Sequence, residues 1–280
     1  MGILAVDDPY VQKVRSLGFT VREINGIDVI TPPVIAIPAG KFKMGAETKD
    51  DPEAFNTESP AHIVTTSAYS IATYPVTVGE FACFVRDGGI RPETRKSVTW
   101  EEQLRHLDHP VVCVRWIDAV EYIFWLGRVT GQVWRLPTEA EWEKAARWDP
   151  DGSEDDARIY PWGNKFDSKR CNTNASRVRS TTPIDKYHQG VSACGLWDMS
   201  GNVWEWTSSV FKSYEYDPND GREDMTSRKH RVLRGGAWLL DPIVARTTCR
   251  NKENPITFAG YFFDVGFRLV LDEIITPASQ

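Results

Sequence analysis

The sequence predicts an α+β fold with little regular secondary structure. Stretches with clear helix start and stop signals gather between residues 77 and 147. Beyond residue 147 the chain is dense in turn-forming pairs such as Asp-Pro, Asp-Gly and Gly-Gly, and only short strand-like runs separate them. Eleven tryptophans in 280 residues supply large buried volumes. Such a composition is typical of a domain whose long loops are held in place by side chains.

Two of the predicted helices begin with a capping box, in which a threonine and the glutamate three residues later satisfy each other's backbone donors. The pairs are Thr77 with Glu80 and Thr138 with Glu141. The first helix is expected to end at the Gly-Gly pair that begins at residue 88.

A third helix is expected over residues 116–131, capped by Asp118 and closed by Gly131. Residues 1–30 are expected to form an N-terminal extension made of a short helix near residues 8–17 and a hairpin that turns at Asn-Gly. The main domain is then expected to span residues 31–272.

Composition and charge narrow the range of functions. The 41% hydrophobic content is enough for a real core, and the net charge of −6 comes without a block of Lys or Arg. Nucleic acid is therefore not expected as a partner. No apolar run approaches the roughly 20 residues that span a membrane, and no secretory segment is recognisable, so membrane insertion is not expected. We expect synthesis in the cytoplasm, and display on a virion or cell surface remains open.

The five cysteines are scattered and include no Cys-x-x-Cys pair. Their odd number and spacing favour free thiols in a reducing compartment over a disulfide framework. They occupy positions 83, 113, 171, 194 and 249.

Eight segments together resemble the formylglycine-generating enzyme (sulfatase-modifying factor) family. They are "IPAGKFKMG", "YPVTVGEF", "PVVCVRW" with "DAVEYIFWL", "WRLPTEAEWEKAAR", "YPWGN", "GLWDMSGNVWEWTS", "RVLRGGAW" and "VGFRLV". They occur in the family's order and cover about residues 32–270. The resemblance implies the family's variant of the C-type lectin fold, in keeping with the α+β prediction.

The resemblance also implies a structural calcium ion at the Trp-Glu-Trp turn. Calcium takes six to eight oxygen ligands, which a tight turn and one carboxylate can supply. The alternative is that the glutamate accepts hydrogen bonds from turn amides. A second family site would map to Asn172 and Thr173, but the later segment that completes it is shortened here. The ligands implied for the first site are the carbonyls of Asp198, Gly201 and Val203 and the side chain of Glu205.

The family's oxidase chemistry depends on a pair of copper-binding cysteines between the Gly-Gly turn and the final Gly-Phe-Arg. Here that segment contains Cys249 alone, so copper and oxidase activity are not expected. Related iron-dependent sulfoxide synthases carry a histidine-rich helical bundle, whereas the five histidines here are dispersed. We interpret His106 and His109 as solvated loop residues; a facial triad with Asp108 is the alternative.

A third branch of this fold comprises the variable proteins of diversity-generating retroelements, in which a randomised segment forms a binding surface. Residues 239–264 resemble such a segment, because Pro and Arg recur as fixed positions and the intervening residue types suit N-N-pyrimidine codons. An aromatic-rich run before residue 265 also suits a contact surface. The predicted surface consists of Leu239, Leu240, Asp241, Ile243, Val244, Thr247, Thr248, Cys249, Thr257, Phe258, Ala259, Gly260, Tyr261, Phe262, Phe263 and Asp264.

The sequence therefore predicts a non-enzymatic ligand-binding protein, in its most specific form a retroelement-diversified variable protein that binds a protein or cell-surface ligand. The first alternative is an oxidoreductase of the formylglycine-generating or sulfoxide-synthase type with an unrecognised metal site. The second is a structural or regulatory domain that acts with a partner from its own operon.

Overall fold

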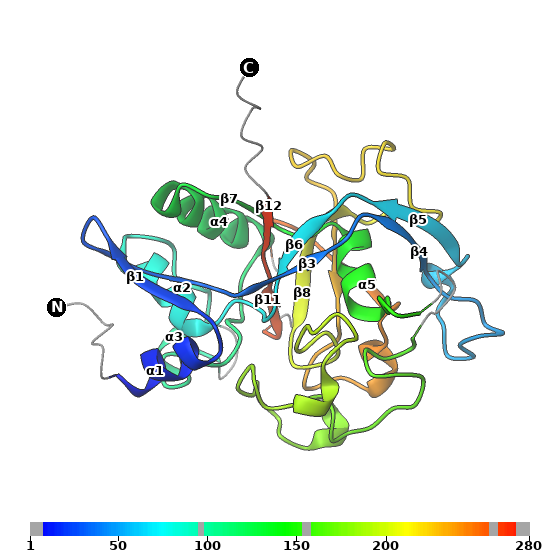
Figure 1. The fold of residues 1–280 in the computed structure, drawn as a ribbon, viewed down its shortest axis with the longest axis horizontal. Helices are drawn as coiled ribbons and strands as arrows, with labels where there is room; N and C mark the ends of the chain where they lie inside the picture. Colours follow the sequence, from blue (N-terminus) through cyan, green and yellow to red (C-terminus); the bar gives the residue numbers. More distant parts are fainter. Residues whose placement is uncertain (1–7, 95–97, 153–157, 258–262, 273–280) are drawn as a thin grey trace.

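The computed structural model describes residues 8–94, 98–152, 158–257 and 263–272. Two four-stranded sheets form the middle of this part of the chain, and a two-stranded ribbon lies toward each end of the molecule (Figure 1). Long connections without regular structure join these elements, as the density of turn residues predicts.

The first sheet is antiparallel and has the strand order β3-β6-β12-β7. It brings the last described strand of the chain between two earlier ones, so the two ends of the domain are joined. Its strands are β3 (Val34–Ile37), β6 (Tyr69–Ala72), β7 (Val133–Arg135) and β12 (Val270–Asp272).

The second sheet has the order β10-β9-β8-β11, in which β11 runs parallel to β8 and the other pairs are antiparallel. The Gly-Asn-Val-Trp-Glu-Trp motif leads into its longest strand, and every residue of that strand is buried. Its strands are β8 (Trp204–Val210), β9 (Arg231–Arg234), β10 (Arg250–Glu253) and β11 (Val265–Phe267).

Both predicted capping boxes are confirmed. In α2 (Val78–Arg86), Glu80 accepts the Thr77 backbone N–H at 2.7 Å, and the Thr77 hydroxyl accepts the Glu80 N–H at 3.2 Å. The same exchange opens α5 (Glu139–Arg147). A single-turn helix, α3 (Trp100–Gln103), was not predicted.

The third predicted helix is present as α4 (Trp116–Thr130), and Gly131 closes it with a left-handed φ of 71°. The predicted cap was wrong: Arg115 is the N-cap, and Asp118 lies three residues later, where its carboxylate accepts the Arg115 backbone N–H at 2.9 Å. Asp118 also binds the Arg115 guanidinium, so the box joins a charge pair to the backbone bond.

The N-terminal helix and hairpin are present as α1 (Pro9–Ser16), β1 (Thr20–Ile24) and β2 (Ile27–Thr31). They pack on the domain rather than standing apart from it, since β2 contacts α2 and Phe19 belongs to the main core cluster. The boundary at residues 30 and 31 remains a prediction. The ribbon at the other end pairs β4 (Gly40–Met44) with β5 (His62–Thr66).

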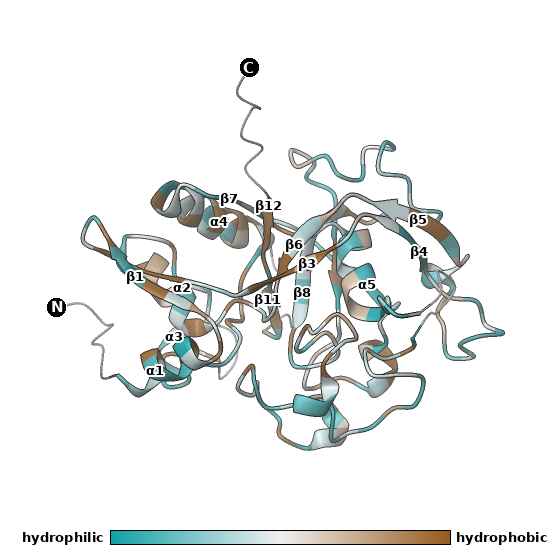
Figure 2. Cartoon of the chain, in the orientation of Figure 1, coloured by the Kyte–Doolittle hydropathy of each residue, from teal (hydrophilic) through white to brown (hydrophobic). Residues whose placement is uncertain are grey.

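Aromatic rings fill the space between the second sheet and the helices. Phe81 of α2 stacks on Tyr122 of α4 with ring centroids 5.5 Å apart, and Phe267 of β11 meets both rings edge-on. Figure 2 shows apolar residues along β3 and β12 at the centre, with more polar loops around them. The same core cluster contains buried tryptophans such as Trp116 and Trp206, as the composition predicts.

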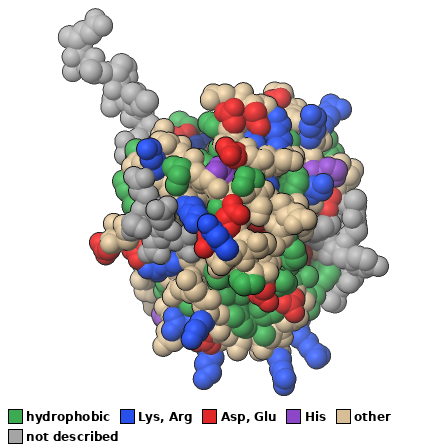
Figure 3. All heavy atoms as spheres, turned by 90° about the vertical axis from the view of Figure 1, so that its right-hand side faces the viewer, with side chains coloured by type: hydrophobic (Ala, Val, Ile, Leu, Met, Phe, Trp, Pro, Cys, Tyr) green, Lys and Arg blue, Asp and Glu red, His purple; other side chains and the backbone are tan. Residues whose placement is uncertain are grey.

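The surface drawn in Figure 3, on the side of the β4–β5 ribbon, mixes Lys and Arg with Asp and Glu, so that face has no continuous basic area. Among the described residues, no helix is long and apolar enough to cross a membrane.

A buried ion pair joins the two sheets. Arg268, between β11 and β12, donates to both Glu205 carboxylate oxygens at 2.6 Å, and the Trp142 indole N–H donates to the same carboxylate at 2.7 Å. All three side chains are fully buried. Arg268 also donates to the carbonyls of Ala72 and Trp197. One guanidinium therefore connects β8, the end of β6 and the turn before the Gly-Asn motif.

We expect Glu205→Ala to lower the free energy of unfolding by about 3–5 kcal/mol, because the Arg268 charge would stay buried without its partner. Urea unfolding monitored by tryptophan fluorescence measures the change. The double variant Glu205→Leu, Arg268→Met removes both charges and is expected to regain much of the loss. A loss that appears only with calcium and disappears with a chelator would contradict this role for Glu205.

Candidate ligand-binding site

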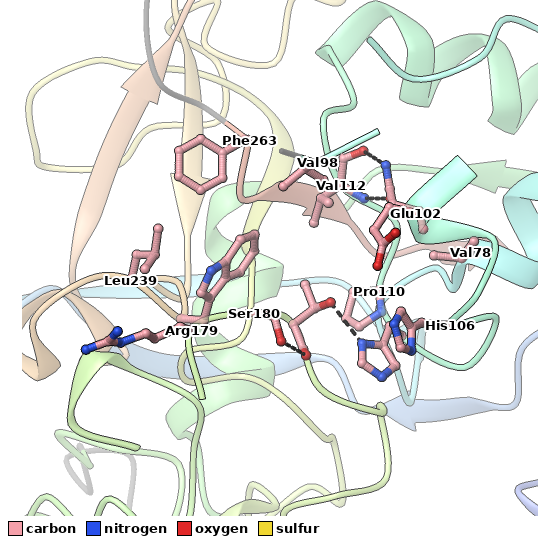
Figure 4. A pocket seen from close by; sticks show the side chains of 14 residues that line it. Val78, Val98, Glu102, His106, Pro110, Val112, Arg179, Ser180, Leu239 and Phe263 are labelled. Atoms are coloured by element: carbon pink, nitrogen blue, oxygen red, sulfur yellow. Dashed lines mark hydrogen bonds between the residues drawn. The ribbon is translucent and has the colours of Figure 1, made fainter. Parts of the chain in front are cut away.

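A cavity of about 600 Å³ lies between the segment 98–112, which contains α3, the loop 179–181 and the segment that follows the Gly-Gly turn. Its volume is in the range of small-molecule sites. Its lining residues come from sequence positions up to 185 apart, and Figure 4 shows how they converge. They are Val78, Val98, Glu102, Gln103, His106, His109, Pro110, Val112, Arg179, Ser180, Thr181, Trp238, Leu239 and Phe263.

One wall of the cavity is apolar. Trp238 and Phe263 meet edge-on with ring centroids 5.8 Å apart, and both are less than a tenth exposed. Val112 also lines the cavity, and the Gln103 side chain holds its backbone by accepting its N–H at 2.9 Å and donating to its carbonyl at 3.2 Å. The two hydrogen bonds between the Gln103 side chain and the Val112 backbone therefore fix this wall in addition to packing.

The loop 179–182 forms the polar wall and is held from the interior. Asn172 donates to the Ser180 carbonyl at 2.8 Å, and the Asn202 side-chain oxygen accepts the Thr182 N–H at 3.0 Å. The Thr181 hydroxyl is 2.9 Å from Nδ1 of His109, on the facing segment. The loop is thus tied to three other parts of the chain.

Asn202 connects both walls. Its side chain holds the polar loop, and its carbonyl accepts the Trp238 N–H at 3.2 Å. The residue has a left-handed φ of 64°, which asparagine tolerates better than most residues do. Gly201 before it has a φ of 76°, and a Cβ there would lie 2.4 Å from the Asn172 carbonyl oxygen. The Gly-Asn pair of the motif is therefore required by close backbone approach beside the cavity.

The charged and titratable side chains that line the cavity differ in whether they have a charge partner. The Glu102 carboxylate pairs with Arg105 at 2.9 Å. Burial lowers the pKa of His109 from 6.5 to about 4, so its ring is neutral at pH 7. Arg179 is exposed and makes no ion pair or hydrogen bond with any other described residue.

Only part of the predicted binding surface is exposed in the described residues. Leu239, Asp241 and Thr257 are exposed, and Leu240, Ile243 and Val244 are partly buried. Residues 258–262 lie outside the described part of the chain. The expectation of exposure is wrong for five positions, whose side chains are less than a tenth exposed: Thr247, Thr248, Cys249, Phe263 and Asp264.

Charge pairs on either side of residues 247–249 explain their burial. Arg246 pairs with Glu58 at 2.7 Å and with Asp51 at 2.6 Å, and Arg250 donates twice to Glu139. The carbonyls of residues 247 and 248 accept hydrogen bonds from the buried Arg234. The segment is thereby fixed in the interior, and its side chains cannot reach a ligand from there.

The ligand set implied for calcium is not assembled at Glu205. Both of its carboxylate oxygens bind the Arg268 guanidinium, and a second cation on them would be repelled at short range. The Asp198 side chain accepts the Asn202 amide at 2.7 Å, and the Gly201 carbonyl accepts the Val203 N–H at 2.9 Å. Glu205 as arranged does not fit the metal, while calcium elsewhere at this turn stays a prediction.

The structure also limits the chemistry of the cysteines. All five are free, and burial raises the pKa of the Cys249 thiol to about 12. A thiol with so high a pKa is a poor metal ligand or nucleophile near neutral pH. Among the described residues, no three His, Cys, Asp or Glu side chains are grouped so that they could hold a metal ion. The residues present therefore do not fit the copper pair of the family.

Fold and cavity together define an α+β, C-type-lectin-like domain with a ligand-sized site beside its Gly-Asn motif. Residues 25–273 match the sulfatase-modifying factor enzyme 1-like domain, and the chain belongs to this family. The resemblance seen in the eight sequence segments is thus confirmed, as is the fold class.

The chain is similar to two kinds of curated relatives. It is 32% identical to hercynine oxygenase of Mycolicibacterium smegmatis over 255 residues, covering 79% of this chain and 58% of that protein. It is also 32% identical to the inactive C-alpha-formylglycine-generating enzyme 2 of Mus musculus, covering 74% of this chain and 75% of that protein. The chain thus spans less than two thirds of the hercynine oxygenases that it matches.

Two solved structures show the same fold. PvdO from Pseudomonas aeruginosa superposes with a TM-score of 0.73 at 27% identity, covering 91% of this chain and 98% of that one. Treponema denticola variable protein 1 superposes with a TM-score of 0.67 at 19% identity, covering 90% and 98%. The second likeness concerns the fold alone.

Sequence reasoning found one side of the cavity and missed the other. Leu239 and Phe263 were in the predicted surface, whereas Arg179 and the helical segment near Glu102 were not. The pair in "LRHLDHP" was the available signal: His106 and His109 do not form a metal triad with Asp108 but line the cavity, with ring centroids 4.7 Å apart. Their approach to residue 239 could not be read from the sequence, since it depends on how three loops pack.

We expect Asn202→Gly to lower the free energy of unfolding by about 2–4 kcal/mol. Glycine keeps the left-handed backbone, so the change isolates the side chain, whose loss removes the acceptor of the Thr182 N–H and of one of the two hydrogen bonds that the Asn172 amide donates. Urea unfolding measures stability, and hydrogen exchange measures protection of the Thr182 amide.

The matched control is Asn25→Gly in the β1–β2 turn, where an exposed asparagine has a similar φ of 53°. Its effect is expected within about 0.5 kcal/mol. Equal effects of the two changes would contradict the role given to Asn202.

Proposed function

We propose that this protein is a non-enzymatic member of its family that binds a ligand in the cavity between Arg179, Trp238 and Phe263. One observation carries the proposal: a cavity of about 600 Å³ lies where both ends of segment 239–264 meet, since Leu239 and Phe263 both line it. An apolar cavity with a few convergent polar groups is the usual form of a small-molecule site.

The supports around the cavity favour binding by a rigid site. The Gln103 clamp fixes one wall, and Asn172 and Asn202 fix the other. A preformed site loses little conformational freedom when a ligand enters, so more of the contact energy remains as affinity. The same rigid frame is what a protein needs if residues at the rim of the site vary.

The absence of oxidase chemistry is part of this proposal and rests on the thiol. Cys249 is buried, its pKa is raised to about 12, and the segment between the Gly-Gly turn and Gly-Phe-Arg contains no other cysteine. Similarity to an inactive formylglycine-generating enzyme paralogue is compatible with a family member that no longer uses this chemistry.

In its finer form, the proposal is that segment 239–264 is diversified by a retroelement. Burial restricts the variable set, because random substitution at residues 247–249 would disturb the interior. The described positions that are not buried, and that this form of the proposal therefore leaves to vary, are Leu239, Leu240, Asp241, Ile243, Val244 and Thr257. The gene should be followed by a near-copy of its 3′ end with adenines at these codons, and DNA sequencing that finds no copy and no reverse transcriptase gene contradicts this form.

An enzymatic function is the second candidate, favoured by the 32% identity to hercynine oxygenase. It would require a metal centre that the described residues do not form by themselves. Metal-dependent oxygen consumption by the purified protein with a thiol peptide or hercynine would favour it over the binding proposal.

We expect N-phenyl-1-naphthylamine, an uncharged aromatic probe, to bind the cavity saturably with one site per chain. Leu239→Trp should weaken this binding by roughly tenfold, because the larger ring occupies part of the space that the probe needs. Fluorescence titration of the probe measures both affinities.

Leu104→Trp is the matched control, since Leu104 and Leu239 are similarly exposed, at 39% and 41%, and Leu104 does not line the cavity. Its affinity for the probe should stay unchanged. Absence of saturable binding, or equal weakening by both variants, would overturn the proposed binding site.

A further inference from the structure

We infer that the ligand of this cavity is a small molecule with an apolar or aromatic body and a single anionic group, which Arg179 binds. The inference rests on the proposed function and names the class of ligand. It depends on three features: a guanidinium without a partner among the described residues, the charge balance around it, and the apolar wall beside it.

Arg179 is positioned by its neighbours rather than by a charge partner. The Ser180 carbonyl is held by Asn172, and the Thr182 N–H is held by Asn202, so the backbone on the C-terminal side of Arg179 is fixed. Arg179 itself has a left-handed φ of 63°, which is costly for a non-glycine residue and persists only when the surroundings impose it. The fold therefore maintains an unfavourable backbone conformation at a residue that lines the cavity and whose exposed guanidinium pairs with no other described residue.

The charge left over at the cavity is positive. Glu102 is neutralised by Arg105, and His109 is uncharged at pH 7. Figure 4 shows Arg179 and Leu239 on one side of the cavity and Glu102 and His106 on the other. An anionic group is thus attracted to the Arg179 side, which gives the ligand one orientation.

The remaining lining suits an apolar body. Trp238 and Phe263 present aromatic surface, and Val98 and Val112 add branched aliphatic surface. The Trp238 indole N–H makes no hydrogen bond with another described residue and can donate to a polar atom of the ligand. A volume of about 600 Å³ accommodates a small aromatic carboxylate, sulfonate or phosphate rather than a folded partner.

The test compares two probes of nearly the same aromatic shape. 1-Anilinonaphthalene-8-sulfonate carries one anionic group, and N-phenyl-1-naphthylamine carries none. Wild-type protein should bind the sulfonate roughly fivefold more tightly, as one partly exposed ion pair allows. Arg179→Met should abolish this preference while leaving the affinity for the neutral probe within about twofold. Raising the salt concentration from about 0.05 to about 0.5 M should weaken the binding of the sulfonate probe and leave the binding of the neutral probe unchanged.

Arg177→Met is the matched control, because Arg177 is exposed and also left-handed, with a φ of 59°, but does not line the cavity. It should keep the preference for the sulfonate. If the neutral probe binds and responds to Leu239→Trp, yet Arg179→Met leaves the preference intact, the inference fails and the proposed site stands. If neither probe responds to Leu239→Trp, the proposed site itself fails.

Discussion

The buried contact between Arg268 and Glu205 is the constraint on which the rest of this fold depends. It places one full charge pair, completed by the Trp142 indole, between the two sheets. Burying charge is costly unless every polar atom is satisfied, and here the guanidinium also donates to backbone carbonyls. Small displacements of either sheet would break several bonds at once. The pair therefore fixes the relative position of β8, β11 and the turn that precedes the Gly-Asn motif.

The cavity is a consequence of that fixed position. Just before β8, the Asn202 side chain accepts a hydrogen bond from the loop 180–182, and its carbonyl accepts one from the Trp238 backbone. One residue therefore holds both walls of the cavity. A second buried charge network, in which Arg246 and Arg250 pair with Glu58 and Glu139, holds the segment after the Gly-Gly turn. Of that segment, Leu239 and Phe263 line the cavity, while Thr247, Thr248 and Cys249 are part of the interior.

This arrangement accounts for how one family scaffold can serve different chemistries. The structural charge pairs lie behind the cavity, and the side chains that would contact a ligand come from loops. Loops tolerate substitution when the frame beneath them is rigid. In this chain the segment in which the resemblance implies a cysteine pair holds a buried Cys249 alone, while the cavity is lined by aromatic rings and by Arg179. Those groups are suited to binding rather than to thiolate chemistry.

The sequence alone determined the family, the α+β class, both capping boxes and the left-handed end of α4, because each depends on residues that are close along the chain or on motifs with fixed order. It did not determine that Glu205 would face an arginine 63 positions away rather than calcium, or that Thr247, Thr248 and Cys249 would be interior. Those outcomes depend on which distant charges meet once the sheets pack. Residue types and spacing do not specify which distant residues come into contact. Only the tertiary structure shows that Arg179 lines the same cavity as Leu239 and Phe263.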